Sequence, residues 1–419
     1  MFSPYQYKCG LDIGSSKIAA CLAVIKGQDI VDIFFDSQKI TGVRYGTITD
    51  SAKVVEGIRR VLVSLRAKVK VPIRQLYTNI SGQDIHWKTV HTVIPLTERG
   101  TKLINSLDVE RITQQVLLLG SSLDEEIIHH IPLSFSVDNK TGIRNPEGMA
   151  GHTLAVEMQL ICAKISALQT ISYAVQSAAC EARDISFSGL ATAEVVFDDT
   201  LRHGVNILID MGADITEILI FSEGLLQEII LLHTGGNDLT RLLMERFSLP
   251  FEVAEELKLS CSMDNYFSDS AKEKETLVKS DGQLRALRQK EVISALSEKT
   301  KTICLLLKDE LERKIKFSEI KNCFFCGQAV LQEGFLEVAE HIFGIPVELA
   351  RIREHTLAAY LSSNIQLGGL KYMTYLTALG LVVRHLSFHP PKILETKNPS
   401  ANFFQKAYHK LWEIYQEYF

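Results

Sequence analysis

Apolar and polar residues alternate in three short runs near the start of the chain, and glycine-containing turns separate the runs. Alternation with a period of two is typical of strands that bury one face, and glycine marks the turns between them. The pattern therefore predicts three strands joined by tight turns, at about 8–13, 17–25 and 30–38.

A helical pattern follows these strands. After a capping residue, Asp50 or Ser51, apolar residues recur at intervals of three and four. We expect an amphipathic helix whose apolar face packs on the strands. Its buried residues are predicted to be Val54, Val55, Ile58, Val61, Leu62 and Leu65.

The rest of the chain contains an insertion and a repeat. Residues 84–164 combine several strand patterns with one helix, which predicts a small α+β insertion. Further on, an apolar run reaches Asp210, turns at Gly212 and resumes at Ile218. This repeats the order of strand, Asp-x-Gly turn and strand found near residue 12, and it predicts an internally duplicated α/β fold.

Two other stretches have less specific patterns. Residues 264–290 are polar, charged and rich in serine, which favours a solvated loop or an exposed helix. The apolar run that begins at Tyr372 ends at Arg384 and is shorter than the roughly 18 residues of a membrane-spanning helix. It therefore predicts a buried helix.

The composition is that of a globular protein, with 419 residues of which 46% are hydrophobic and 23% charged. A formal net charge of −5 and a pI of about 6.2 give no uniformly basic surface, so we expect no nucleic-acid partner. The first residues lack a basic segment followed by an apolar one, which favours a cytoplasmic protein over a secreted one.

Eight cysteines are scattered along the chain without paired spacings, as expected for reduced and mostly buried thiols. The one close pair is Cys323 and Cys326. Such a pair can supply half of a zinc site or a redox centre, but no second pair of cysteines or histidines completes four ligands. We therefore interpret both residues as core thiols.

The turn after the first predicted strand reads Asp-x-Gly-Ser-Ser-Lys. Hydroxyl and N–H groups in such a turn can hold phosphate oxygens, and its aspartate can hold a hydrated Mg²⁺ ion. An ordinary turn with glycine at its bend would look the same, so the motif alone has low specificity. Its residues are Asp12, Gly14, Ser15, Ser16 and Lys17.

Specificity comes from five motifs in a fixed order. They are "LDIGSSKIAACLA", "GVRYGTITDSAKVVEGI", "IPLSFSVDNKTGIRNPEGMAGHTLAVEMQL", "GGNDLTRLLMERFSLPFEVAEELK" and "TALGLVV". With these motifs the chain resembles the FtsA family of bacterial cell-division proteins, which belongs to the actin, Hsp70 and sugar-kinase superfamily. The resemblance covers essentially the whole chain, and "GIRNPEGMAG" is especially typical of the family.

The resemblance implies an actin-like α/β fold of two lobes, made of duplicated ribonuclease-H-like domains with ATP between them. It implies a protein that forms filaments through an inserted α+β domain and has no enzymatic role. FtsZ, other division proteins and the cytoplasmic face of the inner membrane at the division site are the implied partners. The implied bounds are 1–83 and 165–203 for lobe 1, 84–164 for the insertion, 204–367 for lobe 2, 368–389 for a helix closing lobe 1, 390–401 for a linker and 402–419 for a terminal helix.

Nucleotide-binding residues of the family match this chain in part. The first turn matches throughout, and Gly235 and Gly236 match glycines whose backbone approaches phosphate. Glu255 and Lys258 match a pair that contacts adenosine in relatives, although their spacing equally fits the polar face of an amphipathic helix. The other candidates are Asp210, Gly212, Thr216 and Gly327, and Asp210 would join Asp12 in binding Mg²⁺ through water.

The second turn departs from the family pattern. Ala213, Asp214 and Ile215 replace two glycines and a hydroxyl residue. The Asp214 carboxylate would repel phosphate by about 1 kcal/mol at 4 Å in water, and by more inside a cleft, unless Mg²⁺ bridged the two.

Two other parts of the nucleotide site also depart. Ser188 and Gly189 stand where relatives carry Glu-Pro, whose carboxylate can position water, and Gln328 and Ala329 replace glycines that approach the purine and ribose. We expect ATP and Mg²⁺ to bind weakly or not at all. The alternative is a divergent site that binds ATP through the first turn. Efficient hydrolysis is not expected under either interpretation.

Residues 402–419 follow a polar, proline-containing linker and predict a helix with a broad aromatic stripe. Aromatic rings suit a membrane interface, and FtsA proteins resemble this chain in ending with a membrane-targeting helix. Lysines and glutamates balance, so attraction to anionic lipid would be weak; docking on protein is the alternative. The predicted membrane-binding residues are Phe403, Phe404, Tyr408, Leu411, Trp412, Tyr415, Tyr418 and Phe419.

Two other classes of protein share parts of this pattern. A pilus-assembly adaptor similar to PilM has the same scaffold and early motifs, but it would lack the helix after the terminal linker. A kinase or another ATPase of the superfamily would need an intact second phosphate turn. We therefore expect a membrane-associated adaptor similar to FtsA.

Overall fold

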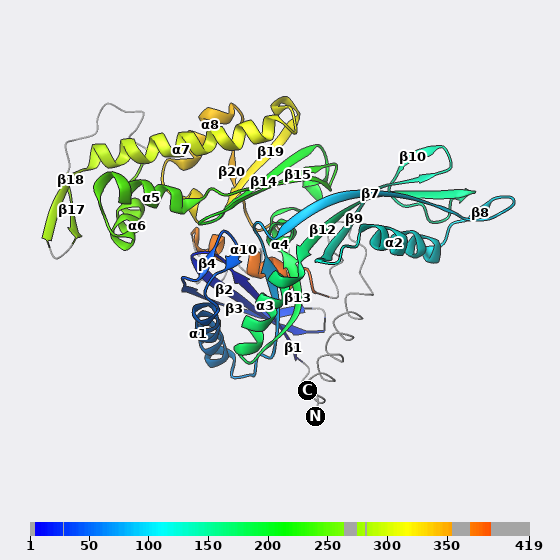
Figure 1. Cartoon of the computed structure of the whole chain (residues 1–419), viewed down its shortest axis with the longest axis horizontal. Helices are drawn as coiled ribbons and strands as arrows, with labels where there is room; N and C mark the ends of the chain where they lie inside the picture. Colours follow the sequence, from blue (N-terminus) through cyan, green and yellow to red (C-terminus); the bar gives the residue numbers. More distant parts are fainter. Residues whose placement is uncertain (1–4, 28, 264–274, 281–282, 354–368, 387–419) are drawn as a thin grey trace.

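The computed structural model describes residues 5–27, 29–263, 275–280, 283–353 and 369–386. Two five-stranded sheets form the centres of two lobes, which lie one above the other in Figure 1. A third sheet extends from them toward one end of the molecule. The arrangement is that of a duplicated α/β protein with one inserted domain.

The sheet of lobe 1 has the strand order β13-β6-β1-β2-β3. The first three strands pair antiparallel, whereas β6 and β13 continue the sheet in parallel pairing. The three strands predicted from alternation are confirmed. The bounds are β1 (Tyr5–Ile13), β2 (Lys17–Lys26), β3 (Asp29–Lys39), β6 (Gln75–Ile80) and β13 (Glu181–Phe187), with a small hairpin of β4 (Val43–Arg44) and β5 (Thr47–Ile48).

The helices of lobe 1 cover its sheet. Asp50 caps α1 (Ser51–Val69) by accepting a hydrogen bond from the Lys53 N–H at 3.2 Å, and the six predicted apolar positions of α1 are buried. The predicted amphipathic helix is thus confirmed. The other helices are α3 (Ile165–Ser177) and α4 (Ser188–Val196).

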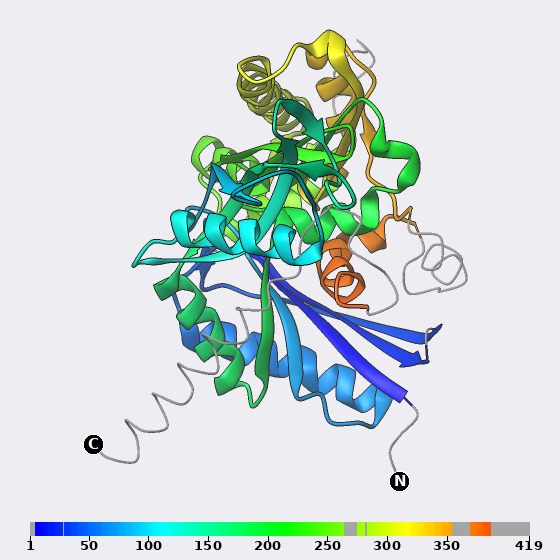
Figure 2. The same ribbon diagram turned by 90° about the vertical axis from the view of Figure 1, so that its right-hand side faces the viewer.

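Lobe 1 is closed by a helix from far along the chain, α10 (Leu376–Val383), which packs against α4 and β1. In Figures 1 and 2 this orange helix lies between the two large sheets. The backbones meet directly, because a Cβ atom at Gly380 would collide with the Ala191 carbonyl and one at Gly10 with the Ala378 carbonyl. The predicted buried helix is confirmed. No helix among the described residues is long and apolar enough to span a bilayer.

The sheet of lobe 2, β16-β15-β14-β19-β20, repeats the order and the pairing of the lobe 1 sheet. The predicted duplication is therefore confirmed. The bounds are β14 (Val205–Met211), β15 (Thr216–Ser222), β16 (Leu225–Leu232), β19 (Ile320–Cys326) and β20 (Glu348–Leu349). The helices are α5 (Gly236–Phe247), α6 (Phe251–Ser260), α7 (Gln289–Glu312) and α8 (Phe335–Phe343).

The expectation of a solvated loop or an exposed helix at 264–290 is wrong for its described strands. β17 (Glu275–Ser280) and β18 (Gln283–Arg288) form an antiparallel hairpin that leads into α7. Val278 and Leu287 are buried against the core of lobe 2. These two apolar side chains attach the hairpin to lobe 2. The surrounding residues are mostly polar or charged, so the sequence shows no regular apolar pattern that would predict the hairpin.

The insertion is a four-stranded antiparallel sheet, β10-β9-β12-β7, with α2 packed on one face around a small core of its own. The "GIRNPEGMAG" stretch runs from the end of β10 through β11, which pairs with β8 in a two-stranded sheet. The bounds are β7 (Ile85–Pro95), β8 (Lys102–Leu103), α2 (Ser106–Gly120), β9 (Glu125–Val137), β10 (Lys140–Ile143), β11 (Ala150–Gly151) and β12 (Thr153–Lys164).

All eight cysteines are free and buried, which confirms their interpretation as core thiols. Cys323 and Cys326 belong to the cores on opposite faces of β19, so they do not converge on one ion. The predicted linker and terminal helix, with the eight predicted membrane-binding residues, lie outside the described residues.

Candidate functional site

The turn between β1 and β2 and the turn between β14 and β15 come together between the lobes. Asp12 and Asp210 lie one residue before the ends of β1 and β14, and Lys17 interacts electrostatically with both carboxylates. Burial raises the pKa of Asp12 to about 6 and also raises the pKa of Asp210, while Lys17 opposes both shifts. The structure therefore brings together the two predicted ligands of hydrated Mg²⁺.

Hydrogen bonds from neighbouring strands and helices orient these groups. Asn79 Nδ2 donates to Asp12 Oδ1 at 2.9 Å, and Thr192 Oγ1 donates to Asp210 Oδ2 at 3.3 Å. Lys17 Nζ donates to the Thr374 carbonyl at 3.0 Å, just before α10. Each charged group thus has a fixed position before any ligand arrives.

Asp214 is held by α5 rather than left unpaired. Its Oδ1 accepts a hydrogen bond from Asn237 Nδ2 at 2.9 Å and lies 3.5 Å from Arg241 Nη1. Its Oδ2 accepts from the Tyr45 N–H of lobe 1 at 3.5 Å. Arg241 also donates to Asp238 Oδ1 at 2.8 Å, so it compensates only part of the Asp214 charge, and Asp214 would repel phosphate somewhat less than an unpaired carboxylate.

The first N–H groups of α5 are used within the protein. The Gly235 N–H donates to Asp238 Oδ2 at 3.0 Å, and the Gly236 N–H donates to the Gly212 carbonyl at 3.0 Å. The Asn237 N–H donates to the Ala213 carbonyl at 2.8 Å. A helix N-terminus binds phosphate through free N–H groups, and these three are engaged.

Glu255 and Lys258 meet beneath the first turn of α5. The buried Lys258 ammonium donates to Glu255 Oε2 at 2.6 Å, to Thr240 Oγ1 at 3.0 Å and to the Gly236 carbonyl at 3.2 Å. An ammonium group has three N–H donors, so all of them have partners inside lobe 2. The pair holds α6 against α5 and leaves no lysine donor for a ribose.

The predicted adenosine loop and Thr216 also make internal contacts. Gly327 has φ +91° and lies so close to the end of β14 that a Cβ atom would collide with the Met211 carbonyl. Gln328 Nε2 donates to Thr374 Oγ1 at 2.9 Å. Thr216 Oγ1 is buried and donates to the Thr234 carbonyl at 2.8 Å, so its hydroxyl tethers the turn to the segment before α5.

Sequence reasoning missed one acidic group, Glu217 on β15. Its carboxyl is buried, accepts a hydrogen bond from Ser81 Oγ of lobe 1, and places Oε2 beside Gly189 without a full hydrogen bond among the described residues. Burial, followed by the charge of Asp210, raises its pKa to about 8. The signal was present, since Glu217 is the only charged residue of its strand and directly precedes four apolar residues.

Ser188 and Gly189 lie next to this carboxyl, at the start of α4. Ser188 Oγ accepts a hydrogen bond from Asn79 Nδ2 at 2.9 Å and donates to the Ile80 carbonyl at 3.2 Å. Gly189 leaves room for two side chains of β15, because a Cβ atom there would lie 2.6 Å from Leu219 Cδ1 and 3.1 Å from Glu217 Oε2. Glu217 thus lies beside Ser188 and Gly189, the two residues that stand where relatives carry Glu-Pro.

ATP with Mg²⁺ is the cofactor that the resemblance implies, and the described residues fit it only in part. Two buried carboxyl groups with raised pKa values suit a hydrated divalent cation, which would relieve their mutual repulsion. The donors expected for phosphate and ribose on α5 and α6 are engaged in internal hydrogen bonds. The residues around Asp12 and Asp210 therefore suit Mg²⁺ better than the residues of α5 and α6 suit the phosphates and ribose of ATP.

Comparison with solved structures identifies the fold. A chain of the PilM-PilN type IV pilus biogenesis complex superposes with a TM-score of 0.61 at 16% identity, covering 90% of this chain and 98% of that one. The ethanolamine utilization protein EutJ from Carboxydothermus hydrogenoformans superposes with a TM-score of 0.51 at 14% identity, covering 90% and 89%. At these identities the likeness shows the fold alone. The protein has the predicted two-lobed, actin-like fold with an inserted α+β domain.

Family models identify the family. Residues 82–162 match the SHS2 domain inserted in FtsA, and residues 207–380 match the cell division protein FtsA. The curated FtsA of Buchnera aphidicola is 26% identical over 95% of this chain and 94% of its own length, and that of Escherichia coli K12 is 22% identical over 85% and 88%. The chain belongs to the FtsA family of cell division proteins.

Proposed function

We propose that this protein is a filament-forming adaptor that tethers FtsZ, with other division proteins, to the cytoplasmic face of the inner membrane. In this proposal the protein binds ATP weakly and is not an enzyme. Family membership supports the link to division. The observation that carries the assembly role is that exposed apolar side chains occur on elements at both ends of the long axis of the molecule.

The surface at one end lies on the insertion. Leucines of β8, α2 and the following loop are exposed, and Leu123 reaches 96% exposure. The other surface lies on lobe 2, at the opposite end of the long axis in Figure 1, on α6 and β17. The residues are Leu103, Leu107, Leu118, Leu119 and Leu123 on the insertion and Phe251, Leu259 and Leu277 on lobe 2.

Two unlike surfaces at opposite ends favour head-to-tail contacts. Such a contact leaves one free copy of each surface, so assembly continues into a filament instead of stopping at a dimer. Burying exposed leucines provides the driving force, at about 25 cal/mol per Å² of apolar area.

Electron microscopy of the protein on lipid monolayers tests the assembly. The wild type should form rows, and Leu118→Gln with Leu119→Gln should abolish them without lowering thermal stability. Val63→Gln is the matched control, because Val63 on α1 has 64% exposure but lies on neither surface. Isolated particles of wild type at high surface density would contradict the proposal.

The membrane role rests on the predicted terminal helix and is tested by liposome co-sedimentation. Truncation after Pro399, or Leu411→Glu with Trp412→Glu, should abolish pelleting, and salt should change it little because the charges balance. Tyr173→Glu, an exposed aromatic on α3, is the control. Pelleting of the truncated chain would place the anchor elsewhere.

The adaptor role requires a direct contact with FtsZ. The full-length protein should retain purified FtsZ in a pull-down, with and without ATP, because the role of the cleft is not catalytic. If the protein forms filaments but does not retain FtsZ, the tethering part of the proposal is wrong and the assembly part still stands.

A further inference from the structure

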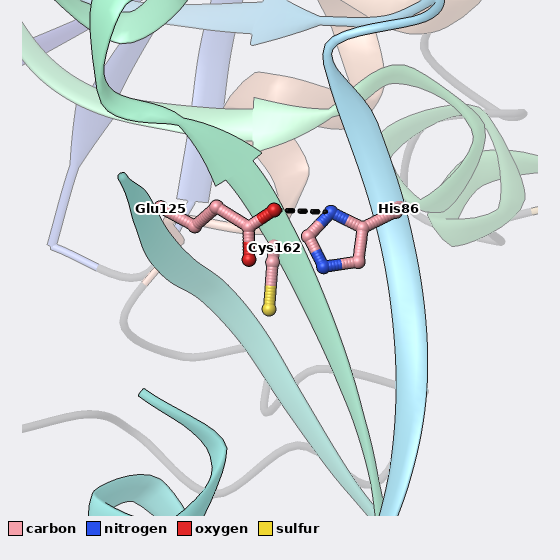
Figure 3. Close-up of side chains that lie close together, drawn as sticks. All are labelled: His86, Glu125 and Cys162. Atoms are coloured by element: carbon pink, nitrogen blue, oxygen red, sulfur yellow. Dashed lines mark ion pairs between the residues drawn. The ribbon is translucent and has the colours of Figure 1, made fainter. Parts of the chain in front are cut away.

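Three strands of the insertion bring together a histidine, a glutamate and a cysteine where the insertion joins lobe 1 (Figure 3). His86 lies directly opposite Cys162 across the β7–β12 pair. Glu125 precedes Ile127, the residue opposite Cys162 on β9, by two positions. Because side chains alternate along a strand, the three residues share one face of the sheet.

The three donor atoms lie close enough to converge on one ion. His86 Nδ1 is 3.0 Å from Glu125 Oε1, and the ligand atoms of all three residues lie within 4.8 Å of one another. Ligands of tetrahedral zinc lie roughly 3.3–3.8 Å apart, given bonds of about 2.0 Å to nitrogen or oxygen and 2.3 Å to sulfur. Side-chain movements that shift the donor atoms by about 1 Å would therefore bring them to the separations of a tetrahedral zinc site.

The surroundings leave one side of the cluster exposed to solvent. α2 covers the same face as far as Leu160, against which Gly120 packs, and it ends there. Beyond this point Cys162 is 1% exposed and forms the floor, while His86 and Glu125 are partly exposed at the rim. An ion bound there would have three protein ligands and one position open to solvent.

The charges also fit a divalent cation. A neutral imidazole, a carboxylate and a thiolate carry a total charge of −2, which balances the ion. Burial raises the pKa of the Cys162 thiol to about 11, so the thiol is protonated when no ion is bound. Ion binding would displace that proton and would tighten as the pH rises.

We propose that His86, Glu125 and Cys162 bind a thiophilic divalent transition-metal ion, of which Zn²⁺ is the type, at the base of the inserted domain. The ion would join β7, β9 and β12 and restrain the insertion where it meets lobe 1. Lys88 Nζ, 4.0 Å from Glu125 Oε2, balances the carboxylate in the metal-free protein.

Cobalt titration of the full-length, chelator-treated protein under reducing, oxygen-free conditions tests the site. One equivalent of Co²⁺ should produce a sulfur-to-cobalt charge-transfer band and intense visible bands of tetrahedral Co²⁺, and Zn²⁺ should displace both. Cys162→Ser should abolish the charge-transfer band. His86→Gln and Glu125→Gln, at partly exposed positions that tolerate substitution, should each weaken Zn²⁺ binding at least about tenfold.

His91→Gln is the matched control, since His91 is an exposed histidine on β7 but lies on the other face of the strand and should leave the titration unchanged. Zn²⁺ should also raise the melting temperature of the wild type and of His91→Gln equally, and that of Glu125→Gln by less. Absence of the charge-transfer band in the folded wild type, or its persistence in Cys162→Ser, would overturn the proposal. The result is independent of filament formation and of FtsZ.

Discussion

The two turns between the lobes have the same backbone connection. In each, four residues separate the last two partners of an antiparallel pair, Ile13 and Ile18 or Met211 and Thr216. The glycine that opens the turn donates to the carbonyl of the fourth residue. The distance is 2.9 Å in both, from Gly14 to Lys17 and from Gly212 to Ile215. Strand pairing fixes this geometry, so it persists through large changes of sequence.

The side chains of the two turns act differently. Lys17 of the first turn faces the cleft and interacts with both central aspartates. Asp214 of the second turn bonds to α5 and the buried Glu217 follows it, whereas Ala19 occupies the position equivalent to Glu217 in lobe 1. The side chains of the second turn therefore connect β15 to α5, whereas the first turn adjoins the charged groups that suit a cation.

The largest expected effect comes from removing the glycine that supports the second turn. Gly327→Ala should destabilise the protein by more than about 3 kcal/mol, because the new Cβ atom collides with the Met211 carbonyl at the end of β14. Gly344→Ala shares the positive φ but has nothing within 4 Å, so it should cost only about 1 kcal/mol. Urea unfolding compares the two. Equal losses would show that φ alone explains both.

The next effect concerns pH. The pKa of Glu217 rises from an ordinary 4.5 to about 8 on folding, so the folded state binds the extra proton between these values. Stability should therefore fall as pH rises from about 4.5 to about 8, by a few kcal/mol. Glu217→Gln should flatten that slope and be more stable than wild type above pH 8; the exposed Glu157→Gln should not. An unchanged slope in Glu217→Gln would contradict the assignment.

A smaller effect is expected on nucleotide affinity. The wild type should bind Mg-ATP with a dissociation constant weaker than about 1 μM, and Asp214→Gly should tighten binding about tenfold, equivalent to about 1.4 kcal/mol. The reason is that the variant removes a carboxylate that would face the phosphates, while Arg241 stays paired with Asp238 at 2.8 Å. Asp214→Asn separates charge from size in the same calorimetric titration. Submicromolar binding by wild type would refute the weak-site interpretation.

The smallest effect concerns the tether at the end of the second turn. Thr216→Val should cost about 1 kcal/mol, because it leaves the Thr234 carbonyl without its buried donor. The equivalent residue of the first turn, Ile18, needs no such bond. Thr216→Ser keeps the hydroxyl and should lose less. Chemical denaturation of the three proteins measures the difference.

Local patterns in the sequence were enough to predict much of the fold. Period-two alternation located β1 to β3, the Asp50 cap located α1, and the repeated Asp-x-Gly turn revealed the duplication. The hairpin of β17 and β18 was missed, because its burial depends on only two apolar side chains. Structure that depends on regular patterns of neighbouring residues can be predicted from the sequence, whereas structure that depends on one or two isolated apolar residues cannot.

The candidate site was less predictable because partners come from distant parts of the chain. The convergence of Asp12 and Asp210 follows from the duplication. Glu217 contacts Ser81 of the other lobe, and Lys258 donates to two residues of α5. These partners lie far apart in the sequence, so no local sequence pattern predicts either contact. The cluster of Figure 3 is hidden for the same reason, since its three residues lie on separate strands.

The position of α10 also sets the order in which the protein can fold during synthesis. The core of lobe 2 draws its buried residues from Ile207 to Phe343, one continuous segment. The core of lobe 1 begins at Cys9 and needs Leu379 and Val382 of α10. Lobe 2 can therefore close on the ribosome first, whereas lobe 1, although translated first, must wait with an open face until α10 emerges.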